Sequence, residues 1–262
     1  MLTNIKSKSF ANGYVYLLHT EDKYPIETTF TWLPAYTKDA INENSNKLHD
    51  ADVGSWTDRA FIGLSVMSGC PVRCKFCATG KLKRWRNLTA QEIVEQVDFV
   101  LNAHPDFDPY KAKEFKFNLT RMGEPFLNID NVRQAIDMLK QRFPDAHYYI
   151  STIGVKNSDF SWVKDNVTLQ ISLHSLDDER RNWLIPYGAK LKISELGAIR
   201  VESKLKTTLN LTLVDEKDFD INKLMAMFDP KVFFVKVSPI NPNDVSDANC
   251  LGTGVIEASN LL

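Results

Sequence analysis

The sequence predicts an α/β protein with a parallel sheet of six strand–helix units, arranged as a partial barrel that stays open on one side. From residue 59 onward, short runs of β-branched and aromatic residues alternate with stretches whose apolar residues recur at helical spacing. A closed barrel of this kind has eight such units, so six predict an open one with accessible strand ends.

The six strand-like runs cover residues 61–66, 114–119, 147–152, 167–173, 207–214 and 232–239. Between the first two runs, residues 89–92 have the pattern of a capping box, in which Thr89 and Glu92 satisfy each other's backbone groups at a helix start. The apolar residues that then share one helical face are Ile93, Val97, Val100 and Leu101.

A second helix is predicted to stop before Pro144, because proline cannot continue it. Its apolar stripe consists of Val132, Ile136, Leu139 and Phe143. Weaker helical patterns cover residues 193–204 and 221–228, and residues 161–164 are predicted to form at most a turn or two.

Residues 1–58 differ from the rest, and we expect them to form an N-terminal extension packed on a core of residues 59–262. Two strand-like runs at residues 13–19 and 26–32 predict a hairpin. A polar stretch rich in Asn and Asp at residues 36–56 predicts a loop.

The composition limits the class of protein. A chain of 262 residues is long enough for one larger α/β domain with an ample core. Three of the four cysteines fall in one loop and the start has no apolar run of signal-peptide length, so we expect a cytoplasmic protein. No apolar stretch has the length of a membrane span, and a net charge of −1 gives no general attraction for polyanions.

Three cysteines form the most informative motif: Cys70, Cys74 and Cys77 follow the first predicted strand with the spacing Cys-x3-Cys-x2-Cys. Three thiolates on one short loop suit three corners of an iron–sulfur cube and leave one iron open to a substrate or cofactor. Two alternatives remain, namely zinc held by these three with Cys250 or a histidine, and a chance group of buried cysteines. Zinc ribbons usually have two separated Cys-x2-Cys pairs, whereas this chain has no second pair.

A basic run follows the cysteines directly. It combines the indole of Trp85 with the cations of Lys81, Lys83, Arg84 and Arg86. Such a run suits contact with phosphates and stacking on a base. It fits equally well a solvated loop whose cations balance a cofactor carboxylate or nothing at all.

The cysteine spacing, with the aromatic Phe76 before the last cysteine, resembles the signature of the radical S-adenosylmethionine (SAM) superfamily. This resemblance implies a partial TIM-like barrel, a [4Fe-4S] cluster on the three cysteines, and SAM on the open iron. It also implies an external one-electron donor of the flavodoxin or ferredoxin kind, whose electron cleaves SAM to a 5′-deoxyadenosyl radical.

Several strand ends resemble the RlmN/Cfr-type RNA-adenine methyltransferases of that superfamily. The segments are residues 86–89, 122–125, 151–155, 171–175 and 239–242. A carboxylate beside a glycine suits the ammonium of SAM, and the resemblance implies this role for Glu124. By the same resemblance, the SAM-binding residues are Gly123, Glu124, Pro125, Ser151, Ser172, His174 and Asn241. Taken singly, a histidine at a strand end is more often structural, and Asn-Pro is a common turn.

Two further residues are candidates for catalysis. Residues 24–30 resemble the family segment whose carboxylate takes a proton from the adenine, which makes Glu27 a candidate general base. The alternative is an exposed strand glutamate. Cys250 has a context faintly similar to that of the family's methyl-carrying cysteine, and the alternative for it is a spare thiol.

The resemblance also breaks in places. Seven residues before the first cluster cysteine, where the family has a resolving cysteine, this chain has Gly63, which carries no nucleophile. We also expect the chain to lack the family's last strand–helix unit and the helical RNA-contacting domain that precedes its core.

These observations lead to three alternative functions. The first is a radical SAM enzyme that abstracts hydrogen from a nucleotide, a nucleic-acid base or a small molecule, with or without methylation. The second is methyl transfer to an RNA adenine with Cys250 as methyl carrier. The third is a non-catalytic protein that binds an iron–sulfur cluster or zinc.

Overall fold

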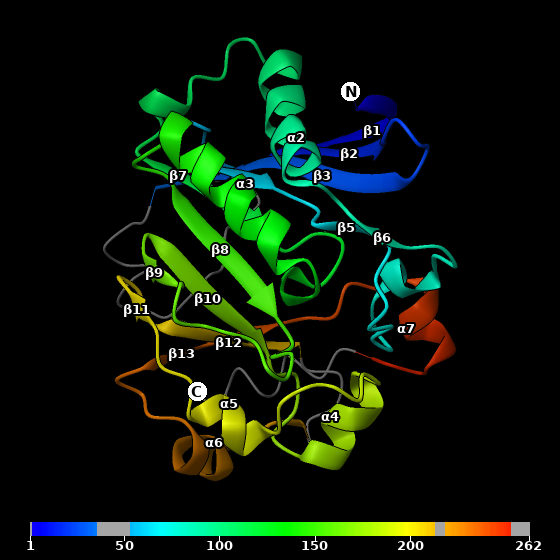
Figure 1. The fold of residues 1–262 in the computed structure, drawn as a ribbon, viewed down its shortest axis with the longest axis vertical. Coiled ribbons are helices and arrows are strands. Elements are labelled where there is room, and N and C mark those ends of the chain that lie inside the picture. Colours follow the sequence, from blue (N-terminus) through cyan, green and yellow to red (C-terminus); the bar gives the residue numbers. More distant parts are fainter. Residues whose placement is uncertain (1, 36–52, 213–217, 253–262) are drawn as a thin grey trace. The chain divides into compact units, whose positions relative to one another are not determined.

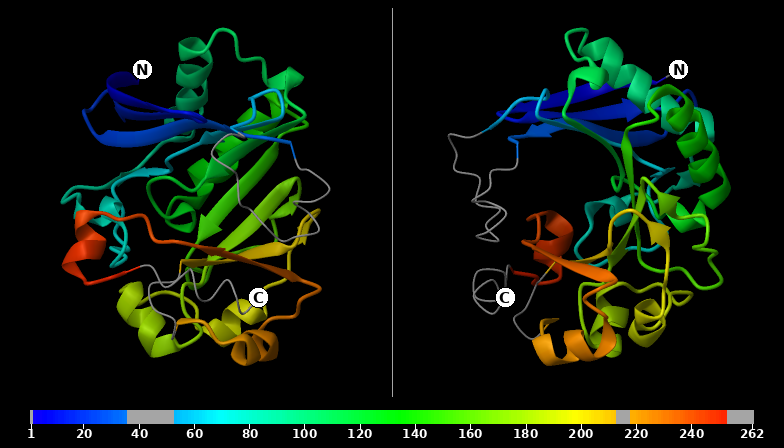
Figure 2. Two further views of the ribbon diagram at one scale, coloured as in Figure 1. Left: turned by 180° about the vertical axis from the view of Figure 1, so that it is seen from behind. Right: turned by 90° about the vertical axis from the view of Figure 1, so that its left-hand side faces the viewer.

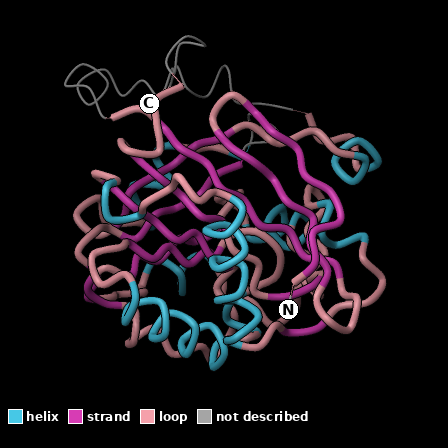
Figure 3. Tube along the Cα trace, turned by 90° about the horizontal axis from the view of Figure 1, so that it is seen from above, coloured by secondary structure: helices cyan, strands magenta, loops and turns pink. Residues whose placement is uncertain are grey.

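The computed structural model describes residues 2–35, 53–212 and 218–252, and the chain divides into two compact units. The first unit comprises Met1–Val66, Leu88–Arg121 and Asp130–Tyr148, and the second comprises Met67–Asn87, Met122–Ile129 and Tyr149–Leu262. Strands and helices alternate along much of the trace (Figure 3), which confirms the predicted α/β class. Among the described residues, no helix combines the length and apolar character needed to cross a bilayer.

The first unit is built on the strands β1 (Thr3–Phe10), β2 (Gly13–His19), β3 (Pro25–Leu33), β4 (Arg59–Gly63) and β7 (Glu114–Leu119). Strands β1 to β4 pair antiparallel in chain order, whereas β4 and β7 are parallel. Strands β2 and β3 form the predicted hairpin. Strand β1 was not predicted, because all its side chains are exposed and show no alternating apolar pattern.

Helices α2 (Ala90–Ala103) and α3 (Ile129–Arg142) lie side by side (Figures 1 and 2), joined by an ion pair of 2.7 Å between Asp98 and Arg142. The capping box before α2 is confirmed, since Thr89 Oγ1 accepts from the Glu92 amide at 3.2 Å and Glu92 Oε2 accepts from the Thr89 amide at 2.9 Å. Both predicted apolar faces are buried, apart from Leu101, which is only half-buried.

The second unit contains the strands β10 (Val167–Ser172), β12 (Thr207–Thr212) and β13 (Phe233–Ser238), which pair parallel in that order. Strand β8 (His147–Thr152) begins in the first unit and ends in the second. The helices of the second unit are α4 (Asp178–Leu184), α5 (Ile193–Gly197), α6 (Ile221–Met227) and α7 (Asp244–Ala248). The six predicted strands are therefore all present.

Several predicted boundaries were wrong. The helix expected at residues 193–204 ends at Gly197. The end of the predicted range is extended instead, because β11 (Glu202–Ser203) pairs with β9 (Lys164–Asp165). The first strand lies at Arg59–Gly63 instead of residues 61–66. Helix α7 was not predicted. Most of the loop predicted at residues 36–56, and the end of the strand predicted at 207–214, lie outside the described residues.

A buried glutamine fixes the chain just after β4. Gln96 on α2 accepts from the Ser65 amide at 2.9 Å and donates to the Ser65 carbonyl at 2.8 Å. Both residues are 0% exposed. The Gln96 amide thus takes the place of a neighbouring strand and forms hydrogen bonds with the backbone N–H and C=O of Ser65 beyond the end of β4.

We predict that Gln96→Leu lowers the free energy of unfolding by roughly 2–5 kcal/mol, because it strands a buried N–H and a buried C=O. Urea unfolding of the metal-free protein measures the change. Gln91→Leu, on the exposed face of the same helix, is the matched control and should shift stability by less than about 0.5 kcal/mol. Equal effects of the two variants would contradict the anchoring role of Gln96.

Candidate functional site

The three predicted ligand cysteines lie in one loop of the second unit, Met67–Asn87, which we call the cysteine loop. Its base is closed by a short antiparallel ladder between β5 (Met67–Ser68) and β6 (Arg86–Asn87). Gly69 follows β5 with φ of +71°, and a Cβ there would lie 2.8 Å from the Cβ of Trp85. Only glycine therefore lets the two sides of the loop approach so closely.

All three thiols of the cysteine loop are free and partly buried. A backbone hydrogen bond of 3.1 Å from the Cys77 amide to the Cys74 carbonyl folds that part of the loop into a tight turn. Burial raises the pKa of the Cys70 thiol to about 12 and that of Cys74 well above its ordinary value, and each is raised further by Cys77 and Glu124. Cys70, Cys74 and this carboxylate thus lie in surroundings of low dielectric.

The residue types on the loop suit an iron–sulfur cube, which is held by cysteine thiolates, each on a different iron. Cys70, Cys74 and Cys77 would supply three such ligands from one short loop. Within residues 2–35, 53–212 and 218–252, no group of three or more His, Cys, Asp or Glu side chains is placed to hold a single metal ion.

Glu124 is buried beside the cysteine loop, with 3% of its surface exposed. Its Oε1 accepts from the Phe126 amide at 3.1 Å, and its Oε2 accepts from the Ile153 amide at 2.9 Å. Burial raises the pKa of this carboxyl to about 7, although these hydrogen bonds and one from Thr152 oppose the shift. Glu124 thereby ties the turn at η3 (Pro125–Leu127) to the carboxyl end of β8.

Gly123 packs closely against Met67. Gly123 has φ of +103°, and a Cβ there would lie 2.5 Å from Cγ of Met67. The sulfur of Met67 also accepts a hydrogen bond from the Glu124 amide at 3.4 Å. Pro125 is the first residue of η3, where its missing N–H has no cost.

The predicted polar residues at the ends of β8 and β10 lie close together. Ser151 Oγ and Ser172 Oγ are 3.3 Å apart and share a hydrogen bond. His174, in the left-handed region with φ of 59°, accepts on Nδ1 from the Thr212 amide at 3.0 Å. Its ring meets the edge of the Phe76 ring at a centroid distance of 4.7 Å, which links this strand end to the cysteine loop.

Burial and the nearby Arg181 lower the pKa of His174 to about 3, so the imidazole is neutral at physiological pH. Because Nδ1 is an acceptor, the proton resides on Nε2, which remains a donor.

Arg181 is a residue of this site that the sequence did not single out. Although 0% exposed, it has no carboxylate hydrogen-bond partner among the described contacts and instead donates to four backbone carbonyls. The acceptors are Ile153 at 2.6 Å, Leu191 at 2.9 Å, Leu173 at 3.1 Å and Ser172 at 3.3 Å. Arg181 lies in a run of charged residues at 177–181, and the local pattern does not show which of them is buried.

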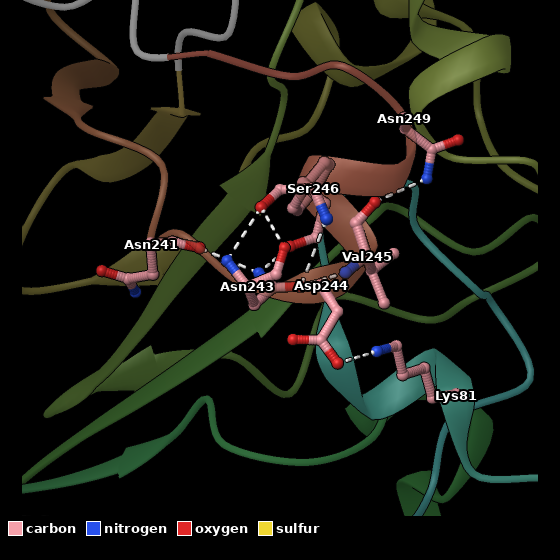
Figure 4. A network of polar contacts seen from close by, with 8 residues as sticks. Lys81, Asn241, Asn243, Asp244, Val245, Ser246 and Asn249 are labelled. Atoms are coloured by element: carbon pink, nitrogen blue, oxygen red, sulfur yellow. Dashed lines mark hydrogen bonds and ion pairs between the residues drawn. The ribbon is translucent and has the colours of Figure 1, made fainter.

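The remaining predicted residues are more exposed. Asn241 is exposed, and its side chain points away from the polar network at α7 (Figure 4). Cys250 follows α7, is exposed, and has φ of 53°. In the basic run, Lys81 forms an ion pair of 2.6 Å with Asp244, and Arg86 donates to the Asn87 carbonyl at 2.9 Å. Lys83 and Arg84 are exposed, as is the neighbouring Trp85.

Glu27 belongs to the first unit, on β3, where it forms an ion pair with Arg121. Its backbone is fixed by Ser65, whose Oγ donates to the Glu27 carbonyl at 2.5 Å. Arg121 also fills the space next to Gly63: a Cβ at residue 63 would lie 2.9 Å from Cδ of Arg121 and 2.3 Å from Oγ1 of Thr29. The space into which a side chain at residue 63 would project is thus filled by Thr29 and Arg121.

A family model described as the radical SAM superfamily matches residues 64–227. The chain belongs to the radical SAM superfamily. The matched range includes the cysteine loop and the strand ends described above.

Curated relatives extend the similarity. The chain is 32% identical over 201 residues to the probable dual-specificity RNA methyltransferase RlmN of Heliobacterium modesticaldum. The matched region covers 70% of this chain and 51% of that relative. It is 32% identical over 207 residues to the dual-specificity RNA methyltransferase RlmN of Marinobacter nauticus, covering 72% of this chain and 55% of that one. The chain therefore spans about half the length of these relatives.

A solved radical SAM methyltransferase from Sphaerobacter thermophilus superposes with a TM-score of 0.69 at 22% identity, covering 99% of this chain and 72% of that one. At this identity the likeness concerns the fold. It agrees with the predicted partial TIM-like barrel of the radical SAM type.

We predict that Arg181→Met lowers the free energy of unfolding by roughly 2–4 kcal/mol, because it leaves buried carbonyls without donors. Chemical unfolding of the metal-free protein measures this. Arg200→Met is the control, since Arg200 is exposed and also donates to two carbonyls, those of Gly197 and Ile199. It should cost less than about 0.5 kcal/mol. An Arg181→Met protein as stable as the control variant would contradict the role of Arg181.

Proposed function

We propose that this chain is a radical SAM enzyme in which Cys70, Cys74 and Cys77 hold a [4Fe-4S] cluster. The observation that carries the proposal is the grouping, within one unit, of three free thiols on one loop with Glu124 and His174 beside them. When bound, such a cluster would supply the electron for reductive cleavage of SAM to a 5′-deoxyadenosyl radical.

The protein's own residues bind and orient SAM in this proposal. Glu124 accepts from the ammonium group, because its two carboxylate oxygens can accept about four hydrogen bonds and those from Phe126, Ile153 and Thr152 use three. Ser151 and Ser172 offer hydroxyl groups at neighbouring strand ends. Neutral His174 offers its Nε2–H as a donor, and Gly123, Pro125 and Asn241 complete the proposed set.

The substrate we propose is a nucleotide, a nucleic-acid base such as one in RNA, or a small molecule. Two observations favour the nucleic-acid alternative. Lys83, Arg84 and Trp85 are exposed together within the cysteine loop, after the three cysteines, where they suit phosphates and a stacked base. The relatives described above are named as RNA methyltransferases. We further propose a cytoplasmic location, where thiols stay reduced and a flavodoxin- or ferredoxin-like donor supplies the electron.

Anaerobic reconstitution tests the proposal. The purified chain, given iron, sulfide, SAM and dithionite, should release 5′-deoxyadenosine, measured by liquid chromatography with mass spectrometry. Cys70→Ala, Cys74→Ala and Cys77→Ala should each lose the cluster and this product, because two thiolates retain a cube poorly. A chain with a full cluster but no 5′-deoxyadenosine would be a non-catalytic binding protein instead.

Methyl transfer with Cys250 as carrier is the second candidate, favoured by the names of the relatives. Glu27 would then be the general base, although its carboxylate is paired with Arg121. Mass spectrometry of purified protein decides this: a methylated Cys250 would support the candidate. An unmodified thiol, together with a Cys250→Ala variant as active as the parent, would eliminate it.

We predict that a cysteine does not fit at residue 63. Gly63→Cys should lower the free energy of unfolding by roughly 1–3 kcal/mol, because the new side chain overlaps Thr29 and Arg121. Adding Arg121→Ala should recover part of that loss in a double-mutant cycle. Gly188→Cys is the control, since a Cβ there has no neighbour within 4 Å. If Gly63→Cys proved as stable as this control, the space at residue 63 would be open after all.

A further inference from the structure

The turn between the last two cysteines is held by a part of the chain far away in sequence. Only Lys75 and Phe76 separate Cys74 from Cys77. These two residues belong to no helix or strand, so their backbone groups need partners from elsewhere. The Lys75 amide donates to the carbonyl of Leu184 at 2.9 Å.

Both carbonyls of the turn accept side-chain amides from the segment around α7. Asn243 Nδ2 donates to the Phe76 carbonyl, and Asn249 Nδ2 donates to the Lys75 carbonyl, each at 3.0 Å. The two asparagines stand at opposite ends of α7, as its N-cap and C-cap. We call these two amide contacts the α7 clasp.

Asn243 is fixed in place by its role as the N-cap of α7 (Figure 4). Its Oδ1 accepts from the Val245 amide at 2.9 Å and from the Ser246 amide at 3.3 Å. Its Nδ2 donates to the Asn241 carbonyl at 2.8 Å as well as to Phe76. With both ends of its amide engaged, the side chain cannot rotate without losing several hydrogen bonds.

Asn249 is held through its Nδ2, which donates to the Val245 carbonyl at 2.8 Å as well as to Lys75. An ion pair of 2.6 Å between Lys81 and Asp244 lies near the clasp, where α7 is beside η1 (Ala78–Lys81) in Figures 1 and 2. Both charges of this pair are largely exposed, so the pair is a weak contact compared with the two amides.

We propose that Asn243 and Asn249 are positioning residues of the cluster site, which hold the turn at Lys75 and Phe76 so that Cys74 and Cys77 present their thiolates in place. This inference rests on the proposed cluster. A loop fixed before binding loses less conformational entropy when its ligands engage. A helix as short as α7 does not persist alone, so the clasp stabilises both partners together.

The test uses variants that remove the two donors, and both changes at Asn243 keep a good N-cap residue for the helix. Asn243→Ser keeps a good N-cap residue but is too short to reach Phe76, and it adds no charge. Asn243→Asp keeps the Oδ1 acceptor and loses the donor, so agreement between the two variants excludes an effect of charge. Asn249→Ala removes the second donor. Asp244→Asn, which breaks only the exposed ion pair, is the control.

Two readouts are needed. Hydrogen exchange of residues 74–82 in the metal-free chain should become roughly fivefold to tenfold faster in the three clasp variants. Iron loss from the reconstituted protein to a chelator should accelerate by a similar factor. Asp244→Asn should stay within about twofold of the parent in both. Circular dichroism first establishes that each variant is folded.

Unchanged exchange and unchanged iron retention in Asn243→Ser and Asn249→Ala would overturn the inference. If the parent chain itself retains no iron, the proposed function fails. The exchange measurement on the metal-free chain then still decides whether the clasp holds the loop.

Discussion

One buried guanidinium holds the strand ends on which the proposed site depends. Parallel strands that stop at one edge leave carbonyl groups without partners, and Arg181 donates to those that follow β8 and β10. Ile153 shows the arrangement most clearly, because its carbonyl accepts from Arg181 while its amide donates to Glu124. The two groups belong to the successive peptide bonds on either side of the Ile153 Cα, so the two side chains together fix the backbone at this residue.

The cysteine loop has little regular structure, and neighbouring segments supply hydrogen-bond partners and packing contacts for it. A two-residue ladder closes its base, Leu184 accepts from one amide, and the ring of His174 packs against Phe76. The amides of α7 satisfy the remaining carbonyls of the turn between Cys74 and Cys77. A loop that carries ligands can therefore be irregular and still fixed, because the turn between Cys74 and Cys77 has hydrogen-bond partners outside the loop.

In the first unit, Gly63 and Glu27 are linked through Arg121. Gly63 is not an empty position, since Thr29 and Arg121 occupy the space where a side chain would project. Arg121 also forms an ion pair with Glu27. The side chain that packs against Gly63 is therefore the same one that pairs with the Glu27 carboxylate. A change at any of these positions is therefore coupled to the others.

The sequence by itself determined the α/β class, the six strands, the capping box at Thr89 and the family, because each depends on local spacing or on a short motif. It also predicted which polar residues follow which strands, since parallel strands end at one edge. The tertiary structure alone decided the burial of Arg181, the filling of the space beside Gly63 and Gly123, and the contact of α7 with the cysteine loop. These features join residues far apart in the chain, and side-chain reach across such separations leaves no periodic trace in the sequence.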